Sequence, residues 1–344
     1  DDLPLIDVPL NAPDPGEWIN DRINRRSYTG ARFRLASGRY NEASRIFLRD
    51  RTSIEGRGIG ATVWQTKAGQ LFVSAGHMHG NFFGVQTHGG GLLSPIHRLW
   101  SAVAYTSRGS YTAVLRPNET IRQSDKYGVF TKPSSFPAQA PKVGQLCFIC
   151  TAERYGRAGR DSSFQKASGA WVKKAAHIIH MPQIVRVVGH RWVGEELELT
   201  FDLPRKCWEP GGKCWLFWYR TGPPRPGDDI DDWWDSGWGG IYSRIVSDIR
   251  IEGLTLENWG GSGSPGGAMR NMLLKDIDWT DYAPGGLAEA MIYSGNGMQC
   301  VTVKNVTFAH SSAGNETKIG STQTLWEGCT FRAVDNLSAW NGHR

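Results

Sequence analysis

Four nine-residue segments in the last third of the chain align with one another, and this internal repeat constrains the fold more than any other feature. The segments are RIEGLTLEN (250–258), LLKDIDWTD (273–281), TVKNVTFAH (302–310) and LWEGCTFRA (325–333). Their equivalent anchor residues are Leu254, Ile277, Val306 and Cys329, which follow one another at steps of 23, 29 and 23 residues. Apolar residues alternate within each segment, and a period of two indicates β-strands rather than helices.

A unit this short cannot bury its own apolar face. The repeat therefore predicts the stacked coils of a solenoid, with a shared core and parallel strands along each side. Within KDIDWTD (275–281), Ile277 and Trp279 are predicted to point inward and Asp276 to lie at a bend. Asp278 then points outward, because alternate residues of a strand face opposite sides.

The same alignment predicts which side chains come together from successive coils. The positions just past the strands, where loops begin, are Asn258, Asp281, His310 and Ala333. A connector and a second β-like run follow each repeat, namely GAMR (267–270), EAMIYSG (289–295) and TKIGST (317–322). These runs predict a second face of the solenoid. Its reactive side chains are Arg270, Glu289, Tyr293 and Lys318.

Composition favours a turn-rich β protein with a mildly basic charge. The chain has 42 Gly and 15 Trp, and 39 basic against 33 acidic residues give a net charge of +6. Such a charge favours an anionic partner, either an acidic polysaccharide or a nucleic acid, although it is also compatible with simple solubility. The sequence has none of the usual nucleic-acid-binding signatures. It also has no apolar run of a length that would span a membrane. We therefore expect neither a nucleic acid nor a membrane as a partner.

Six cysteines are present, and two of them bracket a turn. Cys207 and Cys214 enclose WEPGGK, a spacing that suits a local disulfide, although buried thiols are the alternative interpretation. A disulfide would indicate an oxidising compartment. The chain begins at Asp1 without a signal peptide, as a mature secreted protein or a trimmed piece would. We expect a secreted, extracellular protein.

Three blocks of the sequence resemble a known superfamily. They are WINDRINR (18–25) with the strand-rich segment 30–64, then VGQLCFICTA (143–152) with the β-like segment 182–204, and finally the C-terminal repeat. Together they resemble the right-handed parallel β-helix proteins of the pectate-lyase-like superfamily. The resemblance implies an all-β, right-handed, single-stranded parallel β-helix with a short N-terminal capping helix.

The resemblance also implies a domain plan. One β-helix domain would occupy 1–344, with a small inserted β subdomain at 141–205 and a Trp- and Asp-rich loop at 206–240 over a cleft. Residues 65–140 match less well and are expected to form irregular coils with long loops. The superfamily contains polysaccharide lyases, glycoside hydrolases, epimerases and phage tailspike depolymerases. Tailspike-like proteins trimerise, so the resemblance leaves a trimer open.

The segment RPGDDIDDWWDSGWGG (225–240) is the predicted sugar subsite. Tryptophan faces stack on sugar rings, and carboxylates beside them bind hydroxyl groups. The expected substrate-binding residues are Trp233, Trp234, Trp238, Asp232 and Asp235. A solvated acidic loop with buried tryptophans is the alternative interpretation.

Two kinds of cleavage chemistry fit the candidate residues. A hydrolase needs two carboxyl groups about 5–10 Å apart. The candidates for that pair are Asp232, Asp235, Asp281 and Glu289. A lyase needs a cation for the uronate carboxylate, a base for the C5 proton and an acid for the leaving oxygen. The candidates for those roles are Arg270, Lys318, Tyr293, Tyr282 and His310.

The basic net charge favours an acidic polysaccharide that is cleaved by β-elimination. A glycoside hydrolase is the alternative enzyme. A non-catalytic glycan-binding or structural protein, such as an adhesin or a tailspike-like protein, is the alternative outside catalysis.

Three histidines, His77, His79 and His88, lie close together in the sequence. Three imidazoles can bind a metal, but no acidic ligand is nearby and a His-x-His pair in a strand shares one face without any metal. No metal site is therefore predicted. No cofactor is expected either, and calcium is the only ion left open.

Overall fold

The structure is a computed structural model that describes eighteen segments of the chain. The described residues are 3–25, 30–44, 46–48, 51–66, 72–74, 99–116, 140–151, 163–165, 171–173, 180–206, 212–219, 246–258, 269–281, 292–294, 299–309, 315–317, 322–332 and 339–340. The chain divides into two compact units, one made of residues 1–79 and 222–344 and the other of residues 80–221.

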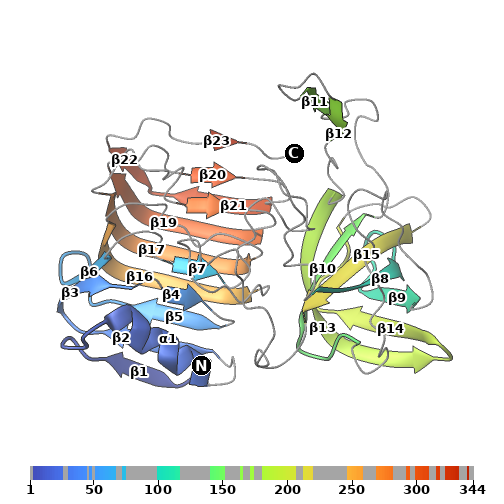
Figure 1. Cartoon of the computed structure of the whole chain (residues 1–344), viewed down its shortest axis with the longest axis horizontal. Helices are drawn as coiled ribbons and strands as arrows, with labels where there is room; N and C mark the ends of the chain where they lie inside the picture. The colour runs from blue at the N-terminus through green and yellow to red at the C-terminus, as the bar shows by residue number, and fades with distance from the viewer. Residues whose placement is uncertain are drawn as a thin grey trace. The chain divides into compact units, whose positions relative to one another are not determined.

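The first unit is built around one large parallel sheet (Figure 1). Its strands pair in the order β1 (Leu5–Val8), β2 (Ala31–Leu35), β5 (Thr52–Glu55), β16 (Val246–Asn258), β17 (Met269–Asp281), β19 (Gln299–Ala309) and β21 (Thr322–Glu327). Three further strands join it at the side, namely β3 (Gly38–Ala43), β6 (Thr62–Thr66) and β22 (Thr330–Arg332).

Two smaller sheets of the same unit are also parallel. One consists of β4 (Ile46–Leu48) and β7 (Phe72–Ser74), and the other of β18 (Ile292–Ser294), β20 (Asn315–Thr317) and β23 (Ala339–Trp340). Successive coils therefore add one strand to each side, which is the architecture of a parallel β-helix. The prediction of an all-β, single-stranded parallel β-helix is confirmed.

The strand register confirms the repeat alignment. Leu254 pairs with Ile277, and Ile277 pairs with Val306, as the steps of 23 and 29 residues predict. In the last coil Trp326 pairs with Val303, again 23 residues away. Ile277 and Trp279 are fully buried, so the apolar residues of KDIDWTD point inward as predicted.

Each long strand turns two corners, and residues with positive φ mark both corners. The first corner of successive coils is formed by Arg51, Asp248, Asn271, Cys300 and Gln323, with φ values between 55° and 60°. The second corner is formed by Gly253, Asp276, Asn305 and Gly328. This left-handed conformation suits glycine and, among other residues, Asn and Asp best.

Side chains at the corners also bond to the coil before or after them. Asn271 Nδ2 donates to Asp248 Oδ1 at 2.9 Å, and Asn305 Nδ2 donates to Asp276 Oδ1 at 2.9 Å. These ladders fix the stacking of the coils at the points where the backbone cannot continue as a regular strand.

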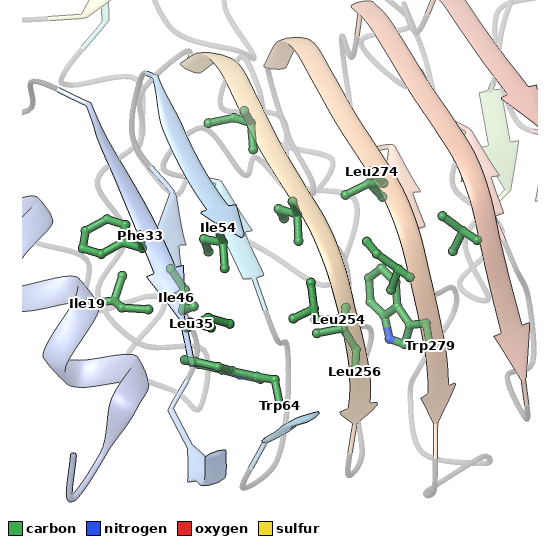
Figure 2. Close-up of a cluster of buried hydrophobic side chains, with 14 of the residues drawn as sticks. Ile19, Phe33, Leu35, Ile46, Ile54, Trp64, Leu254, Leu256, Leu274 and Trp279 are labelled. Carbon is green, nitrogen blue, oxygen red and sulfur yellow. The ribbon is translucent and has the colours of Figure 1, made fainter. Parts of the chain in front are cut away.

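The core of this unit runs through all the coils. Figure 2 shows Phe33, Ile54, Leu254, Leu274 and Trp279 projecting from successive strands toward one interior. Aromatic rings continue the stack into the last coil, since Phe308 lies 6.0 Å from Trp279 and 5.2 Å from Phe331 between ring centroids. Each coil thus covers the apolar side chains of the coil before it.

Helix α1 (Pro15–Arg25) packs against the first coils and buries Ile19 completely. It begins three residues before the predicted start at 18, because Asp14 is its N-cap. Asp14 Oδ1 accepts hydrogen bonds from the Gly16 and Glu17 amides at 3.0 and 3.1 Å. Proline at the first helical position suits this start.

Coil stacking continues across the long insertion between the two halves of this unit. Strand β16 pairs with both β5 and β6, so Ile251 lies beside Ile54 and Thr255 beside Val63. The two partners are about two hundred residues apart in sequence, yet the register is as regular as between adjacent coils.

The second unit is a closed antiparallel barrel. Its strands follow the order β10 (Leu146–Thr151), β13 (His180–Val193), β14 (Glu196–Phe201), β9 (Thr112–Arg116), β8 (Leu99–Tyr105) and β15 (Lys213–Tyr219). A separate two-stranded sheet is formed by β11 (Ser163–Gln165) and β12 (Trp171–Lys173). The barrel has its own apolar core, which includes Leu115, Val187, Leu199, Leu216 and Trp218.

The inserted unit is larger than the segment 141–205 that the sequence indicated. That segment covers β10, β13 and β14, whereas β8, β9 and β15 complete the barrel from outside it. Residues 99–116 were expected to form irregular coils of the solenoid, but they form two barrel strands instead. The chain therefore contains two compact units rather than a single β-helix domain over 1–344.

The predicted disulfide at the turn 207–214 involves one described residue. Cys214 is buried in β15, and its Sγ donates a hydrogen bond to the Ala104 carbonyl at 3.2 Å. Cys207 lies outside the described residues. Among the described helices, none is long and apolar enough to cross a membrane.

Candidate functional site

The last part of each long strand, past the second corner, presents a flat outer face with a row of hydroxyl groups. Strand pairing places Val63, Thr255, Asp278, Thr307 and Thr330 side by side on successive strands. A second row, two residues further along each strand, contains Gln65, Glu257, Thr280 and Arg332, together with Ala309, which is buried. We call the part of these two rows from Thr255 and Glu257 to Thr330 and Arg332 the threonine face.

The threonine side chains are partly or fully accessible. Thr255, Thr280 and Thr307 are half-buried and Thr330 is exposed. Thr255 Oγ1 accepts a hydrogen bond from the Gly60 amide at 3.0 Å, which leaves its proton to donate outward. Hydroxyl groups that both donate and accept at strand spacing can bind a ligand rich in hydroxyl groups.

Asp278 lies in the middle of the hydroxyl row and has no hydrogen-bond or ion-pair partner in the described part of the chain. The other acidic side chains described on β16, β17 and β21 all have one. Their partners are Asn271 for Asp248, Arg250 for Glu252, Arg39 for Glu257, Asn305 for Asp276 and Lys304 for Glu327. Asp278 is therefore the one described carboxylate of these strands that remains available to a ligand.

Charged residues lie on either side of this carboxylate. Glu257 is only 14 % exposed, and both of its oxygens accept hydrogen bonds from the Arg39 guanidinium. Arg332 is exposed in the last described coil. The face thus offers one unpaired anion, one exposed cation and a neutralised ion pair.

The neighbouring outer face, between the two corners, is neutralised by its own ion pairs. Arg32 binds both oxygens of Glu55 at 2.9 and 3.1 Å, and Arg34 binds Asp7 at 2.6 and 2.9 Å. These hydrogen bonds hold the pKa values of Glu55 and Asp7 below their usual range. Carboxylates that are already bound in this way are poorly placed to act on a ligand.

Asp281 lies where the sequence alignment put it. It is the last residue of β17 and pairs with Asn258, the last residue of β16. It directly follows Thr280 of the threonine face. His310, which was predicted at the same position of the next coil, follows the last residue of β19 and lies outside the described residues.

Arg270 is placed differently from the prediction. Met269 and Arg270 are the first residues of β17 rather than a separate run, so Arg270 belongs to the large sheet and not to a second face. It pairs with Ser247 and Gln299, and all three are buried, with Arg270 only 5 % exposed. The guanidinium is thus part of a polar row inside the first sheet.

Tyr293 does lie on a second sheet, as predicted. It is the middle residue of β18 and pairs with Glu316 of β20. The remaining predicted site residues lie outside the described residues: Glu289, Lys318, Tyr282, Trp233, Trp234, Trp238, Asp232, Asp235, His77, His79 and His88.

The threonine face was not recognised from the sequence as a site. The alternation in KDIDWTD correctly put Asp278 outside, but an outward carboxylate on a strand is usually just solvated. The signal that distinguishes it is the register, since Thr255, Thr307 and Thr330 occupy the same position in the aligned repeats. In the described part of the chain, no group of three His, Cys, Asp or Glu side chains could hold a metal ion.

Comparison with known proteins gives weak matches only. No protein-family model and no curated protein sequence matches the chain. Among solved structures, the chain is similar to the tailspike protein gp49 of Pseudomonas phage LKA1, with 12 % identity, a TM-score of 0.42 and coverage of 92 % of this chain and 39 % of the tailspike. It is also similar to the gp54 tailspike of Acinetobacter baumannii bacteriophage AP22, a structure in complex with capsular saccharide, with 10 % identity, a TM-score of 0.38 and coverage of 92 % and 48 %.

A third match is a glycoside hydrolase, with 9 % identity, a TM-score of 0.19 and coverage of 95 % of this chain and 91 % of that one. The chain spans less than half the length of either tailspike. The class of protein therefore rests on the strand pairing: this is a parallel β-helix with an inserted antiparallel barrel.

Proposed function

We propose that the protein binds a polysaccharide across the threonine face and cleaves it next to that face. The observation that carries the proposal is the unpaired carboxylate of Asp278 in a row of threonine hydroxyls. The row crosses the strands at a spacing of about 4.8 Å. A sugar chain that runs across the coils would thus meet a new hydroxyl or carboxylate at each step.

Hydrogen bonds to sugar hydroxyls would supply the specificity of this face. Each is worth roughly 0.5–1.5 kcal/mol net, and a bond to a charged carboxylate more. Asp278 would accept from two adjacent hydroxyls of one sugar residue, because a carboxylate has two oxygens and only acceptors. Thr307 and Thr330 would contact the next residues along the chain.

For the chemical step we propose β-elimination in an acidic, uronate-containing chain. The candidate residues are Asp281, Glu289, Tyr293, Lys318, His310 and Arg270, of which Arg270 is buried. Hydrolysis by a pair drawn from Asp281, Glu289, Asp232 and Asp235 is the second candidate, and Asp281 at the end of the face supports both. Such a protein acts outside the cell, so we propose that it is secreted.

A glycan-binding protein without catalysis is the competing proposal, and the burial of Arg270 favours it. A lyase cation must reach the carboxylate of the substrate, whereas Arg270 is only 5 % exposed. The two proposals share the threonine face and differ only in turnover.

Binding is tested with Asp278→Asn and Thr307→Val, which remove one charge and one hydroxyl with little change of shape. Thr302→Val is the matched control, because Thr302 also points outward and half-buried from β19 but lies between the two corners. We expect affinity for the best polysaccharide of a panel to fall about tenfold in Asp278→Asn, less in Thr307→Val and not in the control. Equal affinities in all three variants would exclude this face.

Cleavage is tested by incubating the protein with acidic and neutral polysaccharides. Ultraviolet absorbance of unsaturated ends together with new reducing ends identifies β-elimination, and reducing ends alone identify hydrolysis. Retained binding without either product would favour the non-catalytic protein. Asp281→Asn should abolish whichever product is formed.

A further inference from the structure

The two units carry opposite net charges. Residues 80–221 contain 19 basic and 9 acidic residues, a net charge of +10, whereas the two segments of the β-helix unit contain 20 basic and 24 acidic residues, a net charge of −4. The positive charge of the whole chain thus comes entirely from the inserted unit. An excess of this size on one compact unit raises the local concentration of anionic partners.

The segment 201–206 leads away from the end of β14, and we call it the closing segment. Arg205 is buried there, and its guanidinium donates to the Ile149 carbonyl and to Gln183 Oε1, both at 3.4 Å. Gln183 in turn donates to the Pro204 carbonyl at 2.8 Å. The closing segment is therefore bonded to β10 through Ile149 and to β13 through Gln183.

The turn between β8 and β9 is bonded to this segment. The Gly109 amide donates to the Arg205 carbonyl at 2.7 Å, and the Arg205 amide donates to the Ser110 carbonyl at 2.8 Å. Arg108 and Lys206 flank this pair of hydrogen bonds, one in the turn and one in the segment. The backbone thus holds the two residues close together.

Arg108 and Lys206 are both exposed, and neither has an ion-pair partner in the described part of the chain. Tyr111, three residues after Arg108 in the same turn, is also exposed, at 52 %. The one described carboxylate of the closing segment, Asp202, accepts a hydrogen bond from the Arg186 amide. We call Arg108, Tyr111 and Lys206 the closed-end cluster.

The opposite end of the barrel has a different chemistry. The hairpin of β13 and β14 carries Glu196 and Glu198, and these bind Arg116 at 2.7 Å and Arg191 at 2.9 Å. Arg116 and Arg191 are thus paired with carboxylates, whereas Arg108 and Lys206 have no ion-pair partner in the described part of the chain. Unpaired cations beside an exposed ring are suited to an anionic sugar, whose carboxylate or sulfate pairs with the cations while its ring packs on the aromatic face.

We propose that the barrel is an anionic-glycan-binding module and that the closed-end cluster is its contact surface. The proposal rests on the proposed action on an acidic polysaccharide and adds the surface that recognises the charged groups of that chain. The inserted unit would bind the charged groups of the glycan, whereas the threonine face would bind its hydroxyl groups. The β-helix unit, with its net negative charge, would not by itself attract such a chain.

The test compares two double variants that lose the same charge from the same unit. Arg108→Gln/Lys206→Gln removes the unpaired cations, and Arg116→Gln/Arg191→Gln removes cations that are ion-paired at the other end. The probes are polygalacturonate, alginate, hyaluronan and dextran sulfate, with dextran as the neutral chain and a single-stranded oligonucleotide as the non-glycan polyanion. Affinity is measured by titration of the full chain at low and at high salt.

We expect the full chain to bind at least one anionic glycan but not dextran, with an affinity that falls steeply as salt rises. Arg108→Gln/Lys206→Gln should weaken that binding about tenfold, and the control pair by less than about twofold. Tyr111→Ala should weaken it without changing the salt dependence, because the ring carries no charge.

Several results would overturn the proposal. They are equal losses in the two double variants, tighter binding of the oligonucleotide than of every glycan, or no binding of any anionic glycan. Parallel titration of Asp278→Asn separates this proposal from the proposed function. A loss only in Asp278→Asn rejects the barrel surface, whereas a loss only in Arg108→Gln/Lys206→Gln rejects the threonine face.

Discussion

The two units of this chain differ in how their strands find partners. In the β-helix unit each long strand pairs in parallel with the strand one coil away, so one register relation is repeated from β16 to β21. In the barrel every pairing is antiparallel and each has its own register, with irregularities in β10 and β13. The first unit is defined by a repeat and the second by a closed ring.

This difference explains why the solenoid tolerates the insertion. Each coil contacts only its neighbours, so a connection between two coils can be lengthened without changing any register. The barrel instead closes on itself, so each of its strands is bonded on both sides within one ring. Two separate cores follow, one in each unit.

The strongest test of this comparison is to remove one buried indole from each core. Trp279→Ala and Trp218→Ala each delete a side chain that is at most 1 % exposed, and we expect each to lower stability by about 3–5 kcal/mol. Because the cores are separate, loss of amide protection should be confined to the unit that carries the substitution. Hydrogen exchange of peptides from β17 and β14 measures this.

One outcome would contradict that expectation. Loss of protection in both units from either variant would show that they unfold as one. Trp279→Phe is the control for ring loss, because the Trp279 Nε1 has no hydrogen-bond partner in the described part of the chain. It should cost clearly less than Trp279→Ala.

A second test compares one glycine from each unit. A Cβ at Gly56 would lie 2.1 Å from the Gly253 carbonyl oxygen of the next coil, so Gly56→Ala must push two stacked backbones apart. We expect a loss of about 3 kcal/mol or more. Gly194, in the turn between β13 and β14, has a φ of +61° and open space around it, so Gly194→Ala should cost only about 1–2 kcal/mol.

Denaturant titration of both glycine variants checks the order. Equal losses of unfolding free energy in the two variants would mean that stacked coils accommodate an added methyl group as easily as a surface turn does. The close backbone stacking that distinguishes the β-helix unit would then be without consequence for its stability.

The sequence predicted the β-helix unit well for a physical reason. The same apolar pattern recurs in each coil, so Leu254, Ile277 and Val306 could be aligned without knowing the fold. The bend at Asp276 was equally readable, because Asp is one of the few residues that accept a positive φ.

The barrel and much of the site could not be predicted in the same way. Closure of the ring depends on pairs such as Lys213 with Tyr105, which lie far apart and follow no period. Arg270 was misplaced because a buried arginine has the same sequence pattern as an exposed one. Asp278 was placed correctly but was not recognised, since the sequence pattern does not show that Asp278 lacks the partners that Glu252 and Glu257 have in the described part of the chain.

Acid should lower the stability of the β-helix unit more than that of the barrel. The pKa values of Asp7, Glu55 and Asp276 are lowered, by hydrogen bonds from Arg34, Arg32 and Asn305 respectively, and all three belong to the β-helix unit. Their folded pKa values lie below the ordinary values of 3.8 and 4.5. These pairs therefore stabilise the folded state fully above those values, and the contribution is lost as the pH falls below them.

All three carboxylates belong to the β-helix unit, so their protonation acts on the stability of that unit. Between neutral pH and pH 3, we expect the β-helix unit to lose more stability than the barrel, measured by exchange-resolved unfolding at each pH. Arg34→Gln has already lost the pair with Asp7, so its stability should fall less at low pH than that of the unchanged protein. An equal fall in both would show that this ion pair is not a cause of the acid sensitivity.

The smallest expected effect sharpens the comparison at a single corner of the solenoid. Cys300 has a φ of +55° between Asn271 and Gln323, and its Sγ donates to Gln323 Oε1 at 3.1 Å. Cys300→Asn should stabilise the β-helix unit by about 0.5 kcal/mol, because Asn accepts this conformation more readily and can extend the amide ladder. Cys329→Asn is the control at the anchor position of the repeat. That side chain packs against the core, so the same change should destabilise the unit. Thermal unfolding of the two variants should therefore shift in opposite directions, and a shift in the same direction would mean that corner conformation does not limit the stability of the coil.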